Sequence, residues 1–306
     1  MKRRMLASCV TATALACAEP LLAQERYRAE AGIDYVQGDG DSSSAVNTKS
    51  VGVSGAYYFR ELPLSPSDYP FDQGPFVERA SELNASYHRT KSELDNFDTS
   101  GNGSSWGVGF VFRRPDTPLF VAARYAASES AKFRSRVTSS EFETDSKSYA
   151  LSAGAYVARN TLVALDWSQS TLRTKNSTSA GASEPKSTDT TIGVVAQHLA
   201  HLAGGTHLAL SAGLSQTKDE TDGSPTEKNE AVSLTGTYYP TKRLGLALGY
   251  AYNHGDDRFS EGQAYLVGAS YFITPAFSLF ANLQAFQGKA TNTDFDAVSL
   301  GAGLRF

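Results

Sequence analysis

The sequence predicts an all-β fold, a transmembrane antiparallel up-and-down β-barrel of about 14 strands, with 12 to 16 possible. Three observations lead to this prediction. Apolar side chains recur at every second position in many segments, and the connections between those segments alternate between short and long. After residue 24, no stretch has the roughly 18 consecutive apolar residues of a membrane-spanning helix.

The alternation is clearest near the end of the sequence. In segment 295–306 one face is apolar, with Val298, Leu300, Ala302, Leu304 and Phe306. The other face carries Phe295 and Arg305 among small residues. A strand with an apolar face and a small or polar face separates two different solvents, as a barrel strand does between lipid and lumen.

Fourteen segments fit this pattern, and an even number places both ends of the barrel domain on the periplasmic side. Their expected spans are 27–37, 49–60, 79–94, 104–113, 118–134, 142–158, 161–175, 187–201, 205–218, 229–239, 243–254, 259–272, 277–290 and 295–306. Backbone groups that face lipid must all be paired, so the sheet is expected to close on itself.

The connections between these segments differ in length and composition. The short ones are 113–117, 158–160, 203–204, 240–242 and 274–276. The long ones, which are polar and rich in Gly and Ser, are 38–48, 96–103, 135–145, 176–186 and 219–228. This asymmetry is typical of outer-membrane barrels, which have tight periplasmic turns and longer extracellular loops. Aromatic residues beside the short turns fit a girdle at the membrane surface.

Residues 1–24 have the layout of a secretory signal peptide, so residues 25–306 are expected to form a single barrel domain. A basic start is followed by a small-residue and apolar stretch that ends near Ala23 and is too short to span a bilayer. The only two cysteines, Cys9 and Cys17, lie in this leader. The exported chain is therefore expected to hold no disulfide and no thiolate metal site.

One connection on the short-turn side is anomalous. Segment 60–78 contains Pro63, Pro66, Pro70 and Pro75, and proline cannot donate to a strand ladder. We expect this connector to form a periplasmic flap or partial plug, with a family-specific insertion as the alternative.

The alternation also assigns charged side chains to the lumen. The expected pore-lining residues are Arg28, Glu30, Asp34, Arg60, Glu82, Arg113, Arg124, Asp166 and Arg305. Two interpretations remain open: these charges line an aqueous channel, or they pair across the lumen and fill it. Many other lumen positions are Gly, Ala or Ser, which leave space and favour the channel.

The chain resembles Gram-negative outer-membrane β-barrels of the porin-like class. The resemblance rests on the alternating hairpins, on the last strand with Phe306 at its end, and on segments 57–59 and 74–81. Tyr57-Tyr58-Phe59 and the later Phe-x-x-Arg-Ala-Ser start of a strand are similar to a stretch of proteobacterial porins. The resemblance implies an outer-membrane location, contact with membrane lipids and lipopolysaccharide, and insertion by the barrel assembly machinery, which would read Phe306. It also implies passive passage of small hydrophilic solutes or ions, without identifying a solute.

Other functions find less support in the sequence. A barrel enzyme would need a His near a Ser, but His207 and Ser211 are separated by about 13 Å along a strand. We expect no enzyme activity, no cofactor and no metal site. With a net charge of −4 and no basic run, nucleic acid is not an expected partner. A non-conducting structural or adhesin-like surface barrel stays open as the alternative to a channel.

Overall fold

A computed structural model gives the arrangement of most of the chain. It describes residues 25–41, 46–94, 99–129, 133–134, 141–178, 181–222, 224–255, 261–289 and 294–306. The expected leader, residues 1–24, lies outside the described residues.

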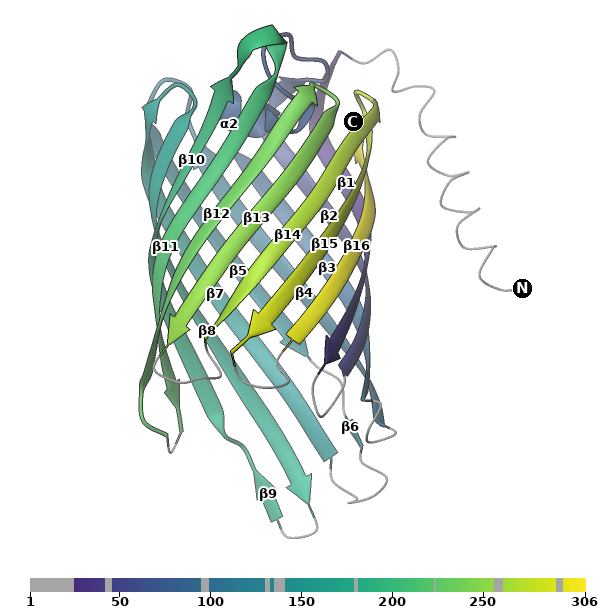
Figure 1. Cartoon of the computed structure of the whole chain (residues 1–306), viewed down its shortest axis with the longest axis vertical. Coiled ribbons are helices and arrows are strands. Elements are labelled where there is room, and N and C mark those ends of the chain that lie inside the picture. The colour runs from purple at the N-terminus through teal and green to yellow at the C-terminus, as the bar shows by residue number, and fades with distance from the viewer. Residues whose placement is uncertain are drawn as a thin grey trace, which may run out of the picture.

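The described part of the chain contains sixteen strands in one antiparallel sheet (Figure 1). They are β1 (Arg26–Asp41), β2 (Val46–Pro63), β3 (Glu82–Leu94), β4 (Thr99–Arg113), β5 (Leu119–Glu129), β6 (Phe133–Arg134), β7 (Glu141–Ala158), β8 (Thr161–Thr178), β9 (Gly181–Ser183), β10 (Lys186–His201), β11 (His207–Thr221), β12 (Glu227–Thr241), β13 (Leu244–Gly255), β14 (Gly262–Thr274), β15 (Phe277–Gly288) and β16 (Asp294–Arg305). β1 pairs with both β2 and β16, so the sheet closes into a barrel. Without the short strands β6 and β9, which only prolong hairpins, fourteen strands form the ring.

All fourteen predicted strands are present, and the predicted fold class is confirmed. The expected strand 118–134 corresponds to β5, which ends at Glu129, and to the short strand β6, while residues 130–132 lie outside the described residues. The expected start at residue 79 is wrong by three residues, because Arg79 adopts a positive φ of 49° and β3 begins only at Glu82. A positive φ is incompatible with an extended strand.

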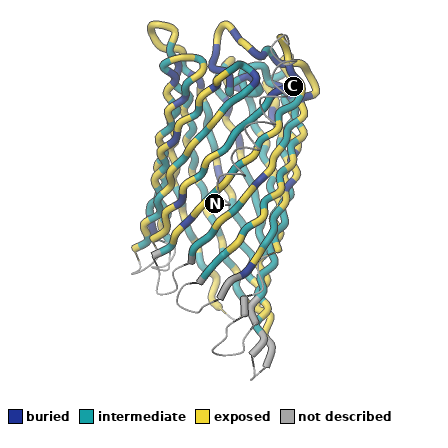
Figure 2. The backbone as a smooth tube through the Cα atoms, turned by 90° about the vertical axis from the view of Figure 1, so that its right-hand side faces the viewer, coloured by how far each residue is buried: buried dark blue, intermediate teal, exposed yellow. Residues whose placement is uncertain are grey.

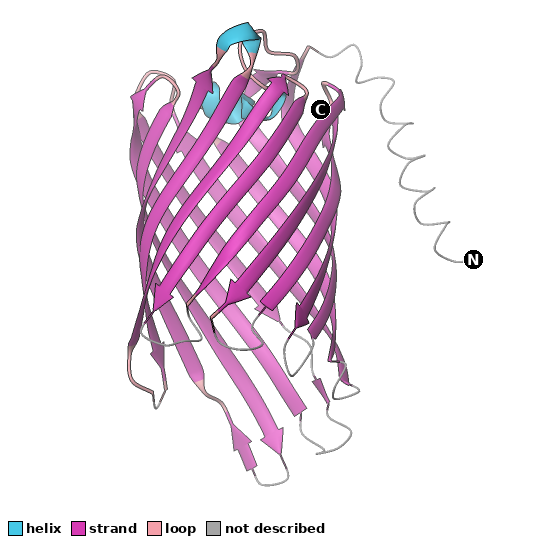
Figure 3. Cartoon of the chain, in the orientation of Figure 1, coloured by secondary structure: helices cyan, strands magenta, loops and turns pink. Residues whose placement is uncertain are grey.

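The short connections all lie at one end of the barrel, here called the turn end, and β6 and β9 project from the other, the loop end (Figures 1 and 3). The outer wall is apolar around the barrel. It exposes large side chains that include Val53, Leu83, Val108, Leu151, Leu165, Leu214, Leu248, Val267 and Leu300. Such a belt fits the lipid-facing surface of a membrane barrel. Within the described residues, the few helices are too short to be candidates for membrane spans.

Most buried residues lie at the turn end, where the connector folds inside the rim (Figure 2). One cluster joins Tyr27 and Tyr58 to Leu62 and Leu64 of the connector and to Ala80 just after it. A second cluster consists of side chains on β5, β7 and β8, against which Phe76 of the connector packs. The barrel therefore has its packed core at one end and not along its axis.

Close approach between β7 and β8 makes Gly154 the first test of this architecture. A Cβ atom there would lie 2.2 Å from the Val163 carbonyl oxygen, so Gly154→Ala must push the strands apart. We expect it to lower the free energy of unfolding in detergent by about 1–3 kcal/mol, measured by urea titration. Gly55→Ala is the matched control, because its nearest atom is the Glu30 carbonyl oxygen at 3.5 Å. Equal stability of the two variants would contradict this packing.

Candidate functional site: the barrel lumen and its plug

Residues 64–80 form a compact segment inside the turn end of the barrel, here called the plug (Figure 3). It contains a 3-10 turn, η1 (Phe71–Gln73), followed by one turn of helix, α2 (Gly74–Val77). Pro75 stands in the first turn of α2, where its missing N–H costs no hydrogen bond. The prolines thus prevent strand pairing and leave the segment free to fold inward.

One side of the plug is fixed to the strands near the barrel seam. The Arg305 guanidinium is buried and donates to the Phe71 carbonyl oxygen at 2.7 Å. The Phe71 ring packs edge-on against Phe272 of β14, with ring centroids 5.5 Å apart. The Tyr239 hydroxyl donates to the Asp72 carboxylate at 2.9 Å and accepts from the Gln73 amide at 2.9 Å. These bonds hold η1 between β12, β14 and β16.

The rest of the plug contacts the other sides of the ring. The Tyr156 hydroxyl of β7 donates to the Phe76 carbonyl oxygen at 3.3 Å, and the Arg79 guanidinium stacks 4.3 Å above the Tyr156 ring. His207 of β11 bonds through Nε2 to the Asp68 carbonyl oxygen at 3.0 Å. Arg60 donates to the Glu78 carbonyl oxygen at 2.8 Å. Since the anchors come from widely separated strands, the plug spans the mouth of the barrel.

Three of the predicted pore-lining arginines lie in ion pairs near the turn end. Arg305 bonds to Glu30 across the β1–β16 seam at 2.8 Å, and Arg113 lies 3.7 Å from the Glu82 carboxylate. Arg60 lies 3.3 Å from the Glu78 carboxylate of the plug. The predicted charges at this end therefore serve largely to pair with one another and to hold the plug.

Arg28 departs from the strict alternation used to assign it. The pairing of β1 with β2 shifts between Tyr27 and Ala29, and this irregularity buries Tyr27 at 1% exposure. Arg28 instead forms a half-exposed pair with Glu61 at 3.3 Å. A bulge cannot be read from a two-residue period, which is the physical reason for the difference.

The remaining predicted residues lie further from the turn end. The Asp34 carboxylate is 3.6 Å from His88 Nδ1, close to Gly52. Arg124 is opposite Gly109 on β4 and Ala150 on β7, and no ion pair within the described residues involves it. Asp166 is opposite Ser152 and Gly193, also without an ion pair within those residues.

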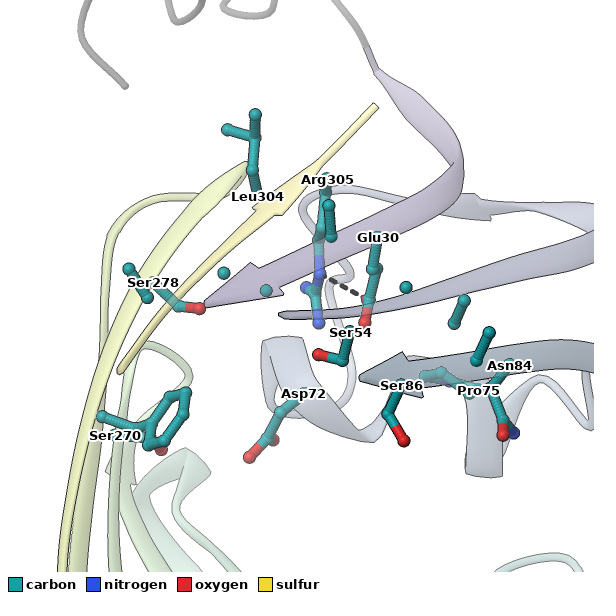
Figure 4. Close-up of a pocket in the computed structure, with 18 of the residues that line it drawn as sticks. Glu30, Ser54, Asp72, Pro75, Asn84, Ser86, Ser270, Ser278, Leu304 and Arg305 are labelled. Atoms are coloured by element: carbon teal, nitrogen blue, oxygen red, sulfur yellow. Dashed lines mark hydrogen bonds and ion pairs between the residues drawn. The ribbon is translucent and has the colours of Figure 1, made fainter. Parts of the chain in front are cut away.

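A cavity of about 540 Å³ adjoins the lumen side of the plug (Figure 4). Its lining includes Glu30, Ser54, Asp72, Arg124 and Arg305. A second cavity of about 280 Å³ lies between the plug and the opposite wall, near Glu82, Arg113 and Thr237. Asp72 lines both cavities, so it lies where the plug borders both of them.

Several residues of the site were not predicted from the sequence. Tyr239 and Asp72 form the plug contact described above, and His88 faces Asp34. Asp189 and Asp219 lie directly opposite each other on the inner face of β10 and β11. Their place could have been found from alternation, because both share a face with the small residues of their strands. The plug partners could not, because they depend on how a proline-rich segment folds.

The described residues contain no group of three or more His, Cys, Asp or Glu placed to hold a metal ion. His207, one of the histidines considered for catalysis, is bonded to the plug backbone and stacks edge-on with His201 at 4.7 Å.

Comparison with known proteins identifies the family. A family model described as "Putative general bacterial porin" matches residues 1–306. This chain belongs to that family. The predicted resemblance is thereby confirmed, and the chain is an outer-membrane β-barrel protein. No curated protein matches the sequence.

Solved structures with the same fold are distant in sequence. The outer membrane protein Omp33 of Acinetobacter baumannii is 17% identical with a TM-score of 0.60, covering 92% of this chain and 99% of its own. The toluene transporter TodX of Pseudomonas putida is 9% identical with a TM-score of 0.53, covering 92% and 90%. At these identities the likeness shows the barrel fold alone.

Docking of the plug is expected to depend on pH through Asp72. Burial raises the pKa of the Asp72 carboxyl above its usual value, although the Tyr239 hydroxyl and Arg305 oppose this shift. A raised pKa means that the docked plug favours the protonated acid, so docking is strongest at low pH and weakens as pH rises through the raised value. We expect an environment-sensitive dye on Ser65→Cys to report looser docking as pH rises from about 4 to about 7.

The variant Asp72→Asn should remove this pH dependence and keep the plug docked at neutral pH, since an amide carries no charge to desolvate. Asp116→Asn, in the turn between β4 and β5, is the control and should leave the profile unchanged. If Asp72→Asn keeps the full pH dependence, another group governs docking.

Proposed function

We propose that this chain is a porin-like channel for passive diffusion of small hydrophilic solutes or ions across the outer membrane, with the plug restricting its turn-end mouth. One observation carries the proposal: the ring has fourteen strands, and most side chains on its inner face are small. Inward positions that the strand register assigns include Gly52, Ser54, Gly107, Ala126, Ser148, Ser152, Ser168, Gly193, Gly213, Ser215, Ser233, Ala247, Gly268 and Gly303. A polar, unfilled interior supports water and solute passage.

Orientation and export complete the proposal. The turn end faces the periplasm and the long loops face outward, after export through a signal peptide at residues 1–24. Insertion would use the barrel assembly machinery, with Phe306 as part of its signal. In support, the Phe306 backbone N–H donates to the Ala29 carbonyl oxygen at 2.9 Å, so this residue extends the seam that closes the barrel.

The plug contacts favour one competing function. Anchors from β2, β7, β11, β12 and β16 could hold the mouth shut permanently, as in a non-conducting structural or adhesin-like barrel. The two functions differ in one measurable property, the current through the inserted barrel with and without the plug.

Replacing residues 65–78 with a short Gly/Ser linker is the direct test of the channel. The purified protein would be inserted into planar bilayers for single-channel recording. We expect small or intermittent steps from the natural chain and larger, stable steps from the plug-free variant, because the lumen behind the plug is open. A plug-free variant that is folded and inserted but passes no current would refute the channel and favour the structural barrel.

The inner charges also support a preference for cations. Among the described residues, one inner-face arginine, Arg124, lacks an acidic partner. The inner-face acids without an arginine partner are more numerous: Asp34, Asp166, Asp189, Asp219 and Glu227. An excess of fixed negative charge in a narrow lumen concentrates positive ions.

Reversal potentials in a KCl gradient should therefore show cation preference in the plug-free barrel. The double variant Asp166→Asn/Asp189→Asn should reduce this preference, and Arg124→Ala should increase it. Glu129→Gln removes an acid from the outer face and should change neither. Anion preference in the unsubstituted lumen would contradict this charge assignment.

A further inference from the structure

A row of aromatic side chains marks a level on the outer wall, on the loop-end side of the apolar belt. On neighbouring strands, Tyr87 is paired with Trp106, and the Trp106 ring lies 5.2 Å from Tyr125. Tyr125 in turn lies 5.0 Å from Tyr149 on β7. Large exposed aromatic rings in such a row are expected at the boundary between hydrocarbon and headgroups. The row therefore places the outer-leaflet headgroups just beyond it, toward the loops.

Three basic residues stand at that level on β2 and β3. Arg89 follows Tyr87 by two positions on the same face, and Lys91 follows it by four. Lys49 on β2 is directly opposite Lys91 in the strand pairing. All three side chains are exposed and point away from the lumen, because the inward positions of these strands carry Ser50, His88 and Thr90. We call Lys49, Arg89 and Lys91 the basic cluster.

The cluster is unfavourable on its own. Like charges directly opposite each other in an antiparallel pair repel and destabilise the sheet. One acid, Glu93, pairs with Lys91, but this leaves two of the three positive charges unbalanced. Arg89 has no ion-pair partner within the described residues. An anion from outside the chain would relieve this repulsion.

Basic residues also face each other elsewhere at this end, but there with acids beside them, since Asp145 on β7 is directly opposite Arg173 and Glu220 bonds to Lys218. Arg173 is directly opposite Lys186, and Lys218 is directly opposite Lys228. The seam is different, because there Asp39 is directly opposite Asp296. Among the described residues, basic pairs thus lie in some sectors of the outer wall and acidic pairs in another, which differs from a uniformly charged rim.

We propose that the basic cluster binds a phosphate group of an outer-leaflet glycolipid. Headgroup phosphates lie within several ångströms of the hydrocarbon boundary, about the height that two to four strand residues span beyond the aromatic row. Arginine matches phosphate oxygens with a planar fork, and lysine side chains reach toward headgroups with flexible stems. The Tyr87 ring below Arg89 supplies the surface on which the lipid's sugar and acyl carbons rest. This site rests on the proposed orientation, in which the loop end faces outward, but not on whether the lumen conducts.

The test measures binding of diphosphoryl lipid A to the purified full-length barrel in detergent by native mass spectrometry. The variant Lys49→Gln/Arg89→Gln/Lys91→Gln should bind about a hundredfold more weakly, since each basic residue near an anionic surface adds a comparable increment. Arg26→Gln/Arg114→Gln/Arg159→Gln removes the same charge from the turn end and should bind like the natural chain. Arg89→Gln alone should bind several-fold more weakly, which keeps the test valid if the triple variant folds poorly.

Thermal unfolding gives a second readout, in which the cluster substitutions should raise stability without lipid but reduce the stability gained with lipid A. Without lipid, the cluster variant should be slightly more stable than the natural chain because repulsion is relieved; with lipid A, it should gain less stability. Dephosphorylated lipid A and inorganic phosphate are the two further ligands. Equal binding of the dephosphorylated lipid, equal stabilisation by inorganic phosphate alone, or an unchanged affinity in the cluster variant would each overturn the proposal.

Discussion

The structure depends on one constraint: every backbone N–H and C=O group in the membrane must find a partner within the sheet. An open sheet cannot meet it, so β1 must pair with β16, and the two ends of the barrel domain must meet. Residues at this seam carry more than one role as a result. The Phe306 backbone extends the seam ladder, while Arg305 bonds across it to Glu30 and reaches inward to the Phe71 carbonyl oxygen of the plug. Arg305 therefore takes part both in closing the barrel and in holding the plug at its mouth.

The plug follows from the same constraint by a different route. A proline-rich connector cannot join the ladder, so its backbone must be satisfied elsewhere, and side chains from the wall supply the partners. Tyr239, Tyr156 and His207 each stand at the turn-end limit of a strand and each bond to the plug. The irregularity between Tyr27 and Ala29 belongs to this arrangement, because it turns an aromatic ring inward beneath Arg305, whose guanidinium lies 4.8 Å from the ring centroid. A strict alternation would have placed a charge there.

The sequence was sufficient to predict the strands of the barrel but not the plug contacts at its turn end, and the reason is physical. Strand alternation is a local property imposed by two solvents, so positions such as Val298 and Leu300 report their face directly, and the fourteen strands follow. Bulges and irregular connectors have no period. Arg28 was therefore assigned by a rule that fails at its position, and the bond between Asp72 and Tyr239, residues far apart in the chain, could not be foreseen. Inner acids such as Asp189 could have been assigned, because they obey the same alternation as the small residues beside them.

A barrel whose buried clusters lie at one end must obtain its stability somewhere other than a central core. The backbone of the wall is satisfied by ladder hydrogen bonds between neighbouring strands, so Gly and Ser can occupy the inner face at little cost to the fold. Among the described residues, packed clusters form where Tyr58 and Leu62 meet the plug, and where Phe120, Tyr156 and Leu162 meet it from the other side. The plug is thus an addition to a ring that closes without it. That separation is what the predicted pH response needs: the charge on Asp72 can weaken docking of the plug while the strands that span the membrane keep their register.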